Sequence, residues 1–297
     1  MPLTRCTPLS SHAVVAVTGD DARSFLQGQL SNDLLGIERH PGMLAASCNR
    51  QGRVLATMRL AADGNGVLLV LHRALAPTLI AQLSAFVLRA DVRFENRSAR
   101  VSVAGLIDAE PDAHWSQAAA AAAGLSMMVA SPRRILLAGT RSALDIALAA
   151  VPRTTPDDWE RASIEDGEPT VVPATAALWL PQMLNLDLIG GVSFSKGCYV
   201  GQEIVARSQN LGRIKRRMLR YVGPPGAVMQ PAQALFSGET LAAQVVTHAR
   251  DDTATQCLAV VELRFCSDLL GSRPGGSEFV PADLPYAIPA PASDKDD

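Results

Sequence analysis

Short apolar runs that end in tight turns constrain the fold of this chain more than any other feature. Residues 42–48 and 53–60 are two such runs, and they flank Asn49-Arg50-Gln51-Gly52, which predicts a β-hairpin. A second turn, Asp63-Gly64-Asn65-Gly66, leads into the apolar run 67–71. Because these strands follow one another through hairpins, we expect an α+β region and not a βαβ array.

Helices and further strands are predicted around these hairpins. Asp20 is placed to cap a helix in which Ala22, Phe25, Leu26 and Leu30 recur at helical spacing. Apolar residues between Leu75 and Val87 form one face of another helix. The other predicted elements are strands at 13–18 and 92–95, and helices within 111–124, at 140–150 and from about Asp157.

The last third of the chain has a different pattern. From about Lys215 onward the sequence holds short alternating runs at 217–222, 234–236, 241–247 and 257–265, without a long helical pattern. This predicts a small all-β module, which we expect to be a barrel. The predicted domains are 1–214 (two α+β subdomains, the first discontinuous), 215–288 (the β-barrel module) and 289–297 (a disordered tail).

Composition excludes several classes of protein. The chain has 297 residues, of which 48% are hydrophobic and 19% charged, as expected for a soluble globular protein. A net charge of −2 gives no general attraction to nucleic acid or membranes. No apolar run reaches the ~18 residues that a membrane span needs, and the N-terminal residues do not resemble a signal peptide. The 5 cysteines show no C-x-x-C spacing, so we expect a reducing cytoplasm and no metal site.

The most informative motif is Lys196-Gly197-Cys198-Tyr199-Val200-Gly201-Gln202-Glu203. Tyrosine is scarce in this chain, with 3 residues, and only 3 of the 27 basic residues are lysines. An ammonium close to a cysteine stabilises the thiolate, so Lys196 and the amides near the glycines are predicted to make Cys198 a functional thiol. Nucleophilic catalysis usually needs a nearby base, and all 5 histidines lie far away in sequence. The alternative is a glycine-rich turn with a structural cysteine.

An aromatic residue and a carboxylate precede this motif. Trp159 and Glu165 lie on a predicted helix, where they could point towards one cavity. An aromatic face beside a carboxylate suits a flat heterocycle with N–H donors, such as a pterin. The alternative is that Trp159 is an ordinary core anchor.

Positive charge is densest at Arg213, Lys215, Arg216, Arg217 and Arg220. Such a cluster attracts phosphates and would suit direct binding of RNA. The alternative is a solvated junction between domains, because charged runs usually lie on the surface.

Together these segments resemble one known family. Lys196–Glu203 is similar to the K-G-C-Y-x-G-Q-E signature of the YgfZ-type folate-binding proteins, which are relatives of the glycine-cleavage T-protein. Residues 27–33 resemble the Q-G-Q-x-(T/S)-x-D segment of that family, and residues 45–53 resemble the hairpin that follows it. Trp159 and residues 164–169 match the segment before the signature. The resemblance covers roughly residues 9–220.

The resemblance implies a T-protein-like α+β fold with three subdomains around a central opening and tetrahydrofolate near its centre. Trp159 and Glu165 match residues that hold the pterin, and Tyr199 and Gln202 are further predicted folate contacts. A second tryptophan that some relatives carry at the folate site is replaced here by His12.

For function, the resemblance implies an accessory role in iron–sulfur cluster assembly or repair, and through it in tRNA modification. The implied partners are iron–sulfur proteins or their assembly machinery. Two alternatives remain open: a folate-dependent aminomethyltransferase, and a module that binds tRNA directly through Arg213–Arg220. The T-protein carries an acidic pair just after its hairpin, whereas this chain has no carboxylate between Asn49 and Asp63. Aminomethyl transfer needs a group that manages protons, so we disfavour that activity.

Overall fold

A computed structural model describes residues 3–112, 114–210, 214–276 and 278–289. The chain divides into two compact units. The first unit comprises Met1–Cys48, Leu55–Trp159 and Gly190–Val200. The second comprises Asn49–Val54, Glu160–Ile189 and Gly201–Asp297. None of the helices in the described ranges is long and apolar enough to cross a bilayer.

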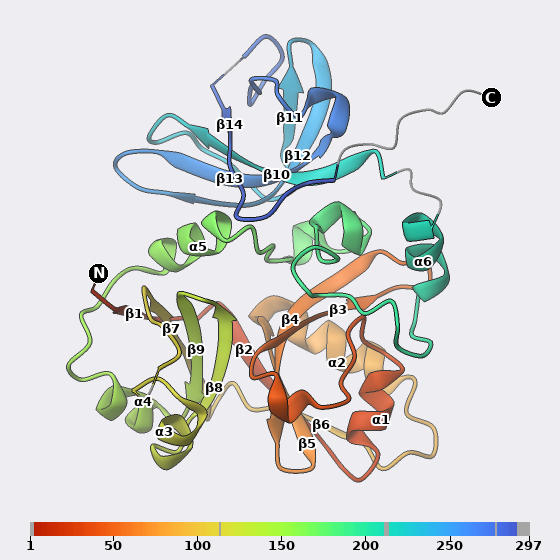
Figure 1. The fold of residues 1–297 in the computed structure, drawn as a ribbon, viewed down its shortest axis with the longest axis vertical. Coiled ribbons are helices and arrows are strands. Elements are labelled where there is room, and N and C mark those ends of the chain that lie inside the picture. Colours follow the sequence, from red (N-terminus) through yellow and green to blue (C-terminus); the bar gives the residue numbers. More distant parts are fainter. Residues whose placement is uncertain (1–2, 113, 211–213, 277, 290–297) are drawn as a thin grey trace. The chain divides into compact units, whose positions relative to one another are not determined.

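The first unit holds a five-stranded sheet in the order β3-β4-β5-β2-β6 (Figure 1). The hairpin strands that the turns predicted are confirmed, and β2 pairs antiparallel with both β5 and β6. The apolar side chains of β2 and β5 are almost all buried, which explains why these runs show little alternation. The strands are β2 (His12–Thr18), β3 (Met43–Cys48), β4 (Val54–Asp63), β5 (Gly66–His72) and β6 (Arg93–Asn96).

Two helices accompany this sheet. Helix α2 (Ala76–Ser84) confirms the helical face predicted from the apolar spacing, and it buries Leu79 and Leu83. Helix α1 (Ala22–Gln27) is shorter than expected, and its N-cap residue is Asp21, without a side-chain cap, so the predicted Asp20 cap was wrong. It ends before Leu30, because Gly28 caps the helix and the chain then turns.

A second sheet in the first unit was not predicted from the sequence. It has the order β1-β7-β9-β8, and its core includes Leu106, Met127, Ile135 and Leu137. These strands lack an alternating pattern because most of their residues are buried, and β8 contains two methionines, which do not favour strands. The elements are β1 (Arg5–Pro8), β7 (Ser102–Ile107), β8 (Ser126–Ser131) and β9 (Arg134–Gly139), with helices α3 (Gln117–Ala122) and α4 (Arg141–Ala147).

Helix α5 (Pro156–Glu165) begins with a well-formed N-terminus. The Asp158 amide donates to the Thr155 hydroxyl at 3.2 Å, and the Thr155 amide donates to the Asp158 carboxylate at 3.2 Å. This reciprocal cap, followed by Pro156 in the first turn, fixes where the helix starts. The boundary between the two units falls within α5, after Trp159.

The second unit ends in an all-β module, as predicted. Its sheet has the order β11-β12-β13-β10-β14, so β11 and β14 are edge strands and the sheet is not a closed barrel. The expected barrel was therefore wrong, because alternation predicts strands but does not determine whether a sheet closes. The elements are α6 (Gln202–Asn210), β10 (Arg216–Gly223), β11 (Ala234–Ser237), β12 (Thr240–Arg250), β13 (Thr255–Glu262) and β14 (Val280–Ala282).

The predicted boundaries at 214/215 and 288/289 remain predictions. The expected disordered tail, 289–297, lies outside the described residues except for Pro289.

Candidate functional site

Lys196, the first residue of the eight-residue motif, is buried in the first unit with 8% of its surface exposed. Its ammonium donates hydrogen bonds to the carbonyl oxygens of Gln27 at 2.6 Å, Leu30 at 2.8 Å and Asn32 at 2.7 Å. An ammonium has three N–H donors, so these bonds use all of them. We call this arrangement the Lys196 clamp, meaning Lys196 Nζ and the three carbonyls.

The position of the clamp follows from the end of helix α1. The last carbonyls of a helix have no partner within the helix, and α1 ends at Gln27. A cation near this end satisfies those carbonyls and also interacts favourably with the helix dipole. Lys196 therefore stabilises a turn that would otherwise leave acceptors unsatisfied in the interior.

Asp33 is positioned by the same turn. Its carboxylate accepts from the Leu35 amide at 3.0 Å and from Gln27 Nε2 at 2.9 Å. The Leu35 amide is the main cause of the lowered pKa of Asp33, with help from Gln27 and the charge of Lys196. Burial lowers the pKa of Lys196 to about 8, and the charge of Asp33 opposes that shift. The structure thus joins the two segments, 27–33 and 196–203, that carry much of the family resemblance.

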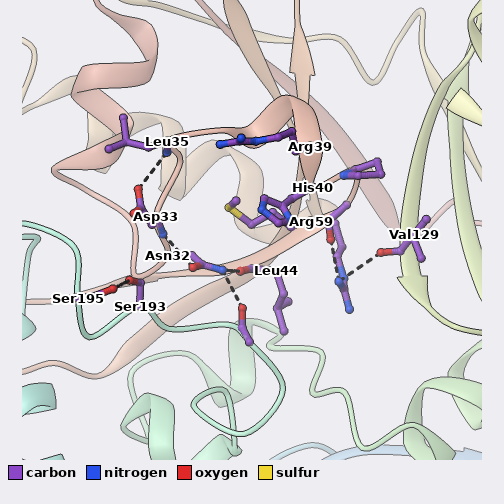
Figure 2. Close-up of a pocket in the computed structure, with 14 residues that line it drawn as sticks. Asn32, Asp33, Leu35, Arg39, His40, Leu44, Arg59, Val129, Ser193 and Ser195 are labelled. Atoms are coloured by element: carbon purple, nitrogen blue, oxygen red, sulfur yellow. Dashed lines mark hydrogen bonds between the residues drawn. The ribbon is translucent and has the colours of Figure 1, made fainter.

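A cavity of about 730 Å³ lies beside the clamp, within the first unit (Figure 2). Its walls come from residues 32–44, from strand β4, from Val129 on strand β8 and from residues 190–195. One wall is held by Asn32, whose side-chain amide donates to the carbonyls of Leu44 and Gly190, each at 2.7 Å. The lining residues are Asn32, Asp33, Leu35, Arg39, His40, Pro41, Gly42, Met43, Leu44, Arg59, Val129, Gly190, Ser193 and Ser195.

The opposite wall is formed where strands β3 and β8 approach each other. The Val129 amide donates to the Pro41 carbonyl at 2.9 Å. Gly42 has a φ of +90°, and a Cβ there would lie 2.5 Å from the backbone of Val129, so only glycine fits. Arg59 donates to the carbonyls of Gly42 and Ala130, each at 2.7 Å, which fixes its guanidinium at the cavity.

Cys198 is exposed, as expected of a functional thiol, but it is not among the residues that line the cavity. Because all three donors of Lys196 bind carbonyls, Lys196 can act on this thiol only through its charge. Tyr199 is buried, and its ring centroid lies 5.4 Å from Lys196 Nζ, a favourable cation–π distance. Burial raises the pKa of Tyr199, so its phenol stays protonated.

Trp159 lies in the core of the first unit and is only 4% exposed. A Cβ on Gly105 would lie 2.4 Å from the indole ring, so the ring packs directly on the backbone of strand β7. The Arg134 guanidinium lies 4.8 Å from the ring centroid and is itself buried. The core-anchor interpretation accounts for these contacts, and a role of Trp159 in ligand binding remains a prediction.

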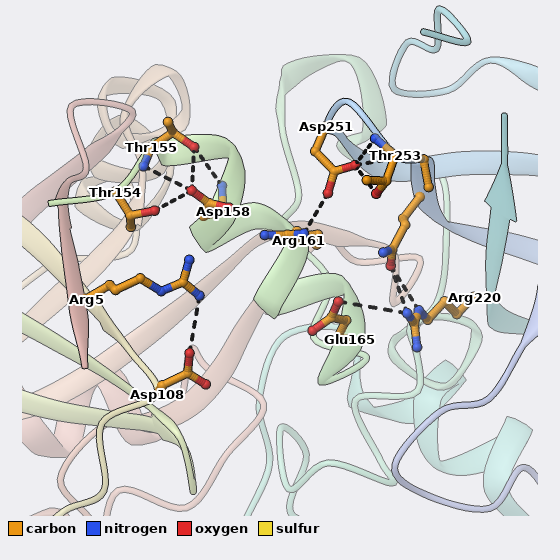
Figure 3. A network of polar contacts seen from close by, with 12 residues as sticks. Arg5, Asp108, Thr154, Thr155, Asp158, Arg161, Glu165, Arg220, Asp251 and Thr253 are labelled. Carbon is orange, nitrogen blue, oxygen red and sulfur yellow. Dashed lines mark hydrogen bonds and ion pairs between the residues drawn. The ribbon is translucent and has the colours of Figure 1, made fainter. Parts of the chain in front are cut away.

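Glu165 and Gln202 belong to the second unit. Glu165 ends helix α5, is 48% exposed on its side chain and lies 3.9 Å from Arg220 (Figure 3). Arg220 also donates to Gln256 at 2.9 Å. Trp159 and Glu165 are six residues apart on α5, which places them on different sides of the helix at about 100° per residue. Gln202 is the first residue of α6 and is partly exposed.

Three described members of the basic cluster lie close to acids, whereas Lys215 is exposed. Arg217 is buried and donates to Asp187 at 2.6 and 3.0 Å and to the Gln182 carbonyl at 2.7 Å. Arg216 pairs with Glu262 at 2.9 Å. Arg213 lies outside the described residues. An arginine buried against a carboxylate cannot reach a phosphate without breaking that pair, so the cluster provides less free positive charge than its sequence indicates.

Several cavity residues were not predicted, notably Arg39, His40, Arg59, Ser193 and Ser195. They come from separate segments and share no motif, although Ser193 and Ser195 lie within three residues of Lys196. His12, at the start of β2, lies within 3.2 Å of the Ser11 hydroxyl through Nδ1. Within the described ranges, no three His, Cys, Asp or Glu side chains gather in a way that could hold a metal ion.

Sequence comparisons identify relatives of this chain. The tRNA-modifying protein YgfZ of Vibrio atlanticus is 29% identical over 238 residues, which cover 77% of this chain and 73% of that protein. The protein of the same name from Escherichia fergusonii is 27% identical over 250 residues, covering 79% and 76%. No protein-family model matches the chain.

Among solved structures, the glycine cleavage system aminomethyltransferase T from Bartonella henselae has a similar fold. The TM-score is 0.71 at 15% sequence identity, and the match covers 94% of this chain and 84% of that protein. The fold is therefore T-protein-like, with mixed helices and sheets.

Proposed function

We propose that this chain, a homologue of the tRNA-modifying proteins YgfZ with a T-protein-like fold, is a cytoplasmic folate-binding accessory protein. In this role it would support the assembly or repair of iron–sulfur clusters in the enzymes that modify tRNA. The observation that carries the proposal is the Lys196 clamp. It joins residues 27–33 and 196–203, the two segments that resemble the motifs of the YgfZ-type proteins.

The predicted folate residues have different roles in this proposal, according to their exposure. Glu165 is exposed, and its 3.9 Å contact with Arg220 leaves its carboxylate able to accept hydrogen bonds from the N–H groups of a pterin. Gln202 is partly exposed and would be a second direct contact. Trp159 and Tyr199 are buried, so they would support the site rather than stack on the ligand.

Cys198 is the proposed functional thiol. It is exposed, so it can meet a sulfur species, a cluster or a cysteine of a partner protein without any rearrangement of the core. The buried cysteines Cys6, Cys48 and Cys257 cannot do so.

No specific contact favours either of the two alternative functions, aminomethyl transfer and direct tRNA binding. Aminomethyl transfer is less supported because strand β4 carries no carboxylate before Asp63 at its end. Direct tRNA binding through the basic cluster is less supported because Arg217 and Arg216 already pair with Asp187 and Glu262.

The proposed folate binding is tested by titrating tetrahydrofolate into the wild-type protein and into the Glu165→Gln variant. We expect saturable binding that weakens about tenfold in Glu165→Gln, because loss of a hydrogen bond to a charged group costs about 1.5 kcal/mol. Glu203→Gln is the matched control, since Glu203 is an exposed glutamate paired with an arginine on α6. No binding by the wild type would refute folate binding, and equal affinities in all three proteins would remove Glu165 from the site.

The accessory role needs a separate test. In a host that lacks its own homologue, we expect the wild type to restore modified tRNA that depends on iron–sulfur enzymes. Cys198→Ala should restore much less, whereas Cys266→Ala, which alters the other exposed cysteine, should behave as the wild type. Full restoration by Cys198→Ala would refute the role given to this thiol.

A further inference from the structure

Two exposed basic side chains face the cavity of the first unit. Arg39 ends the short 3-10 helix Ile37–Arg39, and His40 follows it. Both are exposed, both line the cavity, and neither side chain makes a hydrogen bond or ion pair with another residue of the described chain. Other arginines of this protein pair with acids, as Arg217 does with Asp187.

Hydroxyl donors line another part of the same cavity. Ser193 and Ser195 lie within 3.3 Å of each other through their hydroxyl oxygens. Figure 2 shows these two serines on one side of the cavity and Arg39 and His40 on another. Guanidinium, imidazole and hydroxyl groups are the donors that proteins use to bind carboxylates and phosphates.

The acidic residue at the cavity does not cancel this charge. Asp33 uses its carboxylate to accept from the Leu35 amide and Gln27 Nε2. The charge of Lys196 also acts on Asp33, as the lowered pKa of Asp33 reflects. The negative charge of Asp33 is therefore offset within the wall. Arg39 makes no ion pair within the described chain, and Glu38, whose pKa its charge helps to lower, already pairs with Arg23.

We propose that this cavity is a binding site for a small multidentate anion, one that carries carboxylate or phosphate groups, with Arg39 and His40 as its charged contacts. The volume of about 730 Å³ is within the range of small-molecule sites. A small molecule fits better than a nucleic acid, because the donors line a recess and do not form an exposed stripe. This inference uses only the cavity and its side chains, and it does not depend on the proposed role in tRNA modification.

Calorimetric titration of the full chain with citrate, and separately with pyrophosphate, at low ionic strength tests the proposal. At least one of the two anions should bind saturably with one site per chain, and added salt should weaken binding. The two arms show whether carboxylates or phosphates are preferred. Arg39→Ala/His40→Ala should weaken binding about tenfold, as expected when two partly exposed charged contacts are lost.

The matched control is Arg89→Ala, which removes an exposed arginine of the same unit that does not line the cavity. It should leave the affinity unchanged. A milder variant, Arg39→Lys, keeps the charge but loses the bidentate geometry and should weaken binding about threefold. The proposal is overturned if neither anion binds, if Arg89→Ala weakens binding as much as the double variant does, or if only a tRNA transcript binds and the small anions do not.

Discussion

Lys196 and Trp159 are both scarce, buried residues in the first unit, yet their surroundings differ. Lys196 donates to three carbonyls and thereby holds one wall of an open cavity. Trp159 fills its own space, with its ring on the backbone of Gly105 and beside the Arg134 guanidinium. Burial of a scarce residue therefore does not identify a binding site, because the neighbours determine whether the residue shapes a cavity or completes a core.

The largest expected effect is that of Trp159→Ala. Removing a buried indole leaves a cavity between β7 and Arg134, and such a change costs about 3–5 kcal/mol of unfolding free energy. Urea unfolding followed by circular dichroism measures it. Trp115→Ala is the matched control, since Trp115 is only partly buried against the core of the four-stranded sheet, and it should cost less.

Trp159→Ala also tests whether Trp159 contributes to ligand binding. If Trp159 is a core anchor, folded Trp159→Ala protein should bind ligands in the cavity with nearly unchanged affinity, despite its lower stability. A loss of less than 1 kcal/mol in stability together with a large loss of tetrahydrofolate affinity would show that Trp159 belongs to a ligand site and not to the core.

Lys196→Met is expected to have the next largest effect. It leaves the carbonyls of Gln27, Leu30 and Asn32 without their donor, and unsatisfied buried acceptors cost about 1–3 kcal/mol each. Since methionine fills much of the space and the turn can relax, we expect Lys196→Met to lower the free energy of unfolding by about 2–4 kcal/mol in total. Lys215→Met, at an exposed lysine, should change stability by less than about 0.5 kcal/mol. Equal stabilities of the two variants would refute the clamp.

The contribution of Lys196 to stability is expected to rise with pH above about pH 8. Burial lowers the pKa of Lys196 to about 8, whereas an unfolded lysine titrates near 10.4. Between these values the unfolded chain binds more protons than the folded chain, so the contribution of Lys196 to stability rises with pH. The stability of the wild type relative to Lys196→Met should therefore rise by about 1–3 kcal/mol from pH 8 to 10.5. A fall over this range would mean that the three carbonyls hold the ammonium more strongly than burial disfavours it.

The sequence predicted those helices and strands that are determined by turn residues and by the spacing of apolar residues. The hairpin strands around Gly52, the helix Ala76–Ser84 and the strands of the C-terminal module follow from turns and periodicity. The sheet β1-β7-β9-β8 was not predicted, because strands buried on both faces show no alternation. The closed barrel was wrong because closure depends on pairing between strands far apart in sequence.

The candidate site was predictable only in part. The motif at 196–203 and the segment at 27–33 were identified as separate signals, but their connection through Lys196 Nζ is a tertiary contact over 160 residues or more. Arg39 and His40 lie in no motif, and their relevance follows from a cavity that only the folded chain contains. Conversely, Arg217 looked like surface charge in the sequence because its partner, Asp187, is 30 residues away.

The smallest expected effect compares the two exposed cysteines, Cys198 and Cys266. Burial raises the pKa of Cys48 and of Cys257 to about 12, so neither should react with N-ethylmaleimide in the native protein at pH 7, whereas both exposed cysteines should. Lys196 is two residues from Cys198 and can act on it only through its charge, because its three donors bind carbonyls. We therefore expect Lys196→Met to slow alkylation of Cys198 only about two- to threefold and to leave Cys266 unchanged. Peptide mass spectrometry of timed samples gives both rates in one experiment. An unchanged alkylation rate of Cys198 in folded Lys196→Met would show that Lys196 does not affect this thiol. Lys196 would then only stabilise the cavity wall, and the reactivity of Cys198 would follow from its exposure.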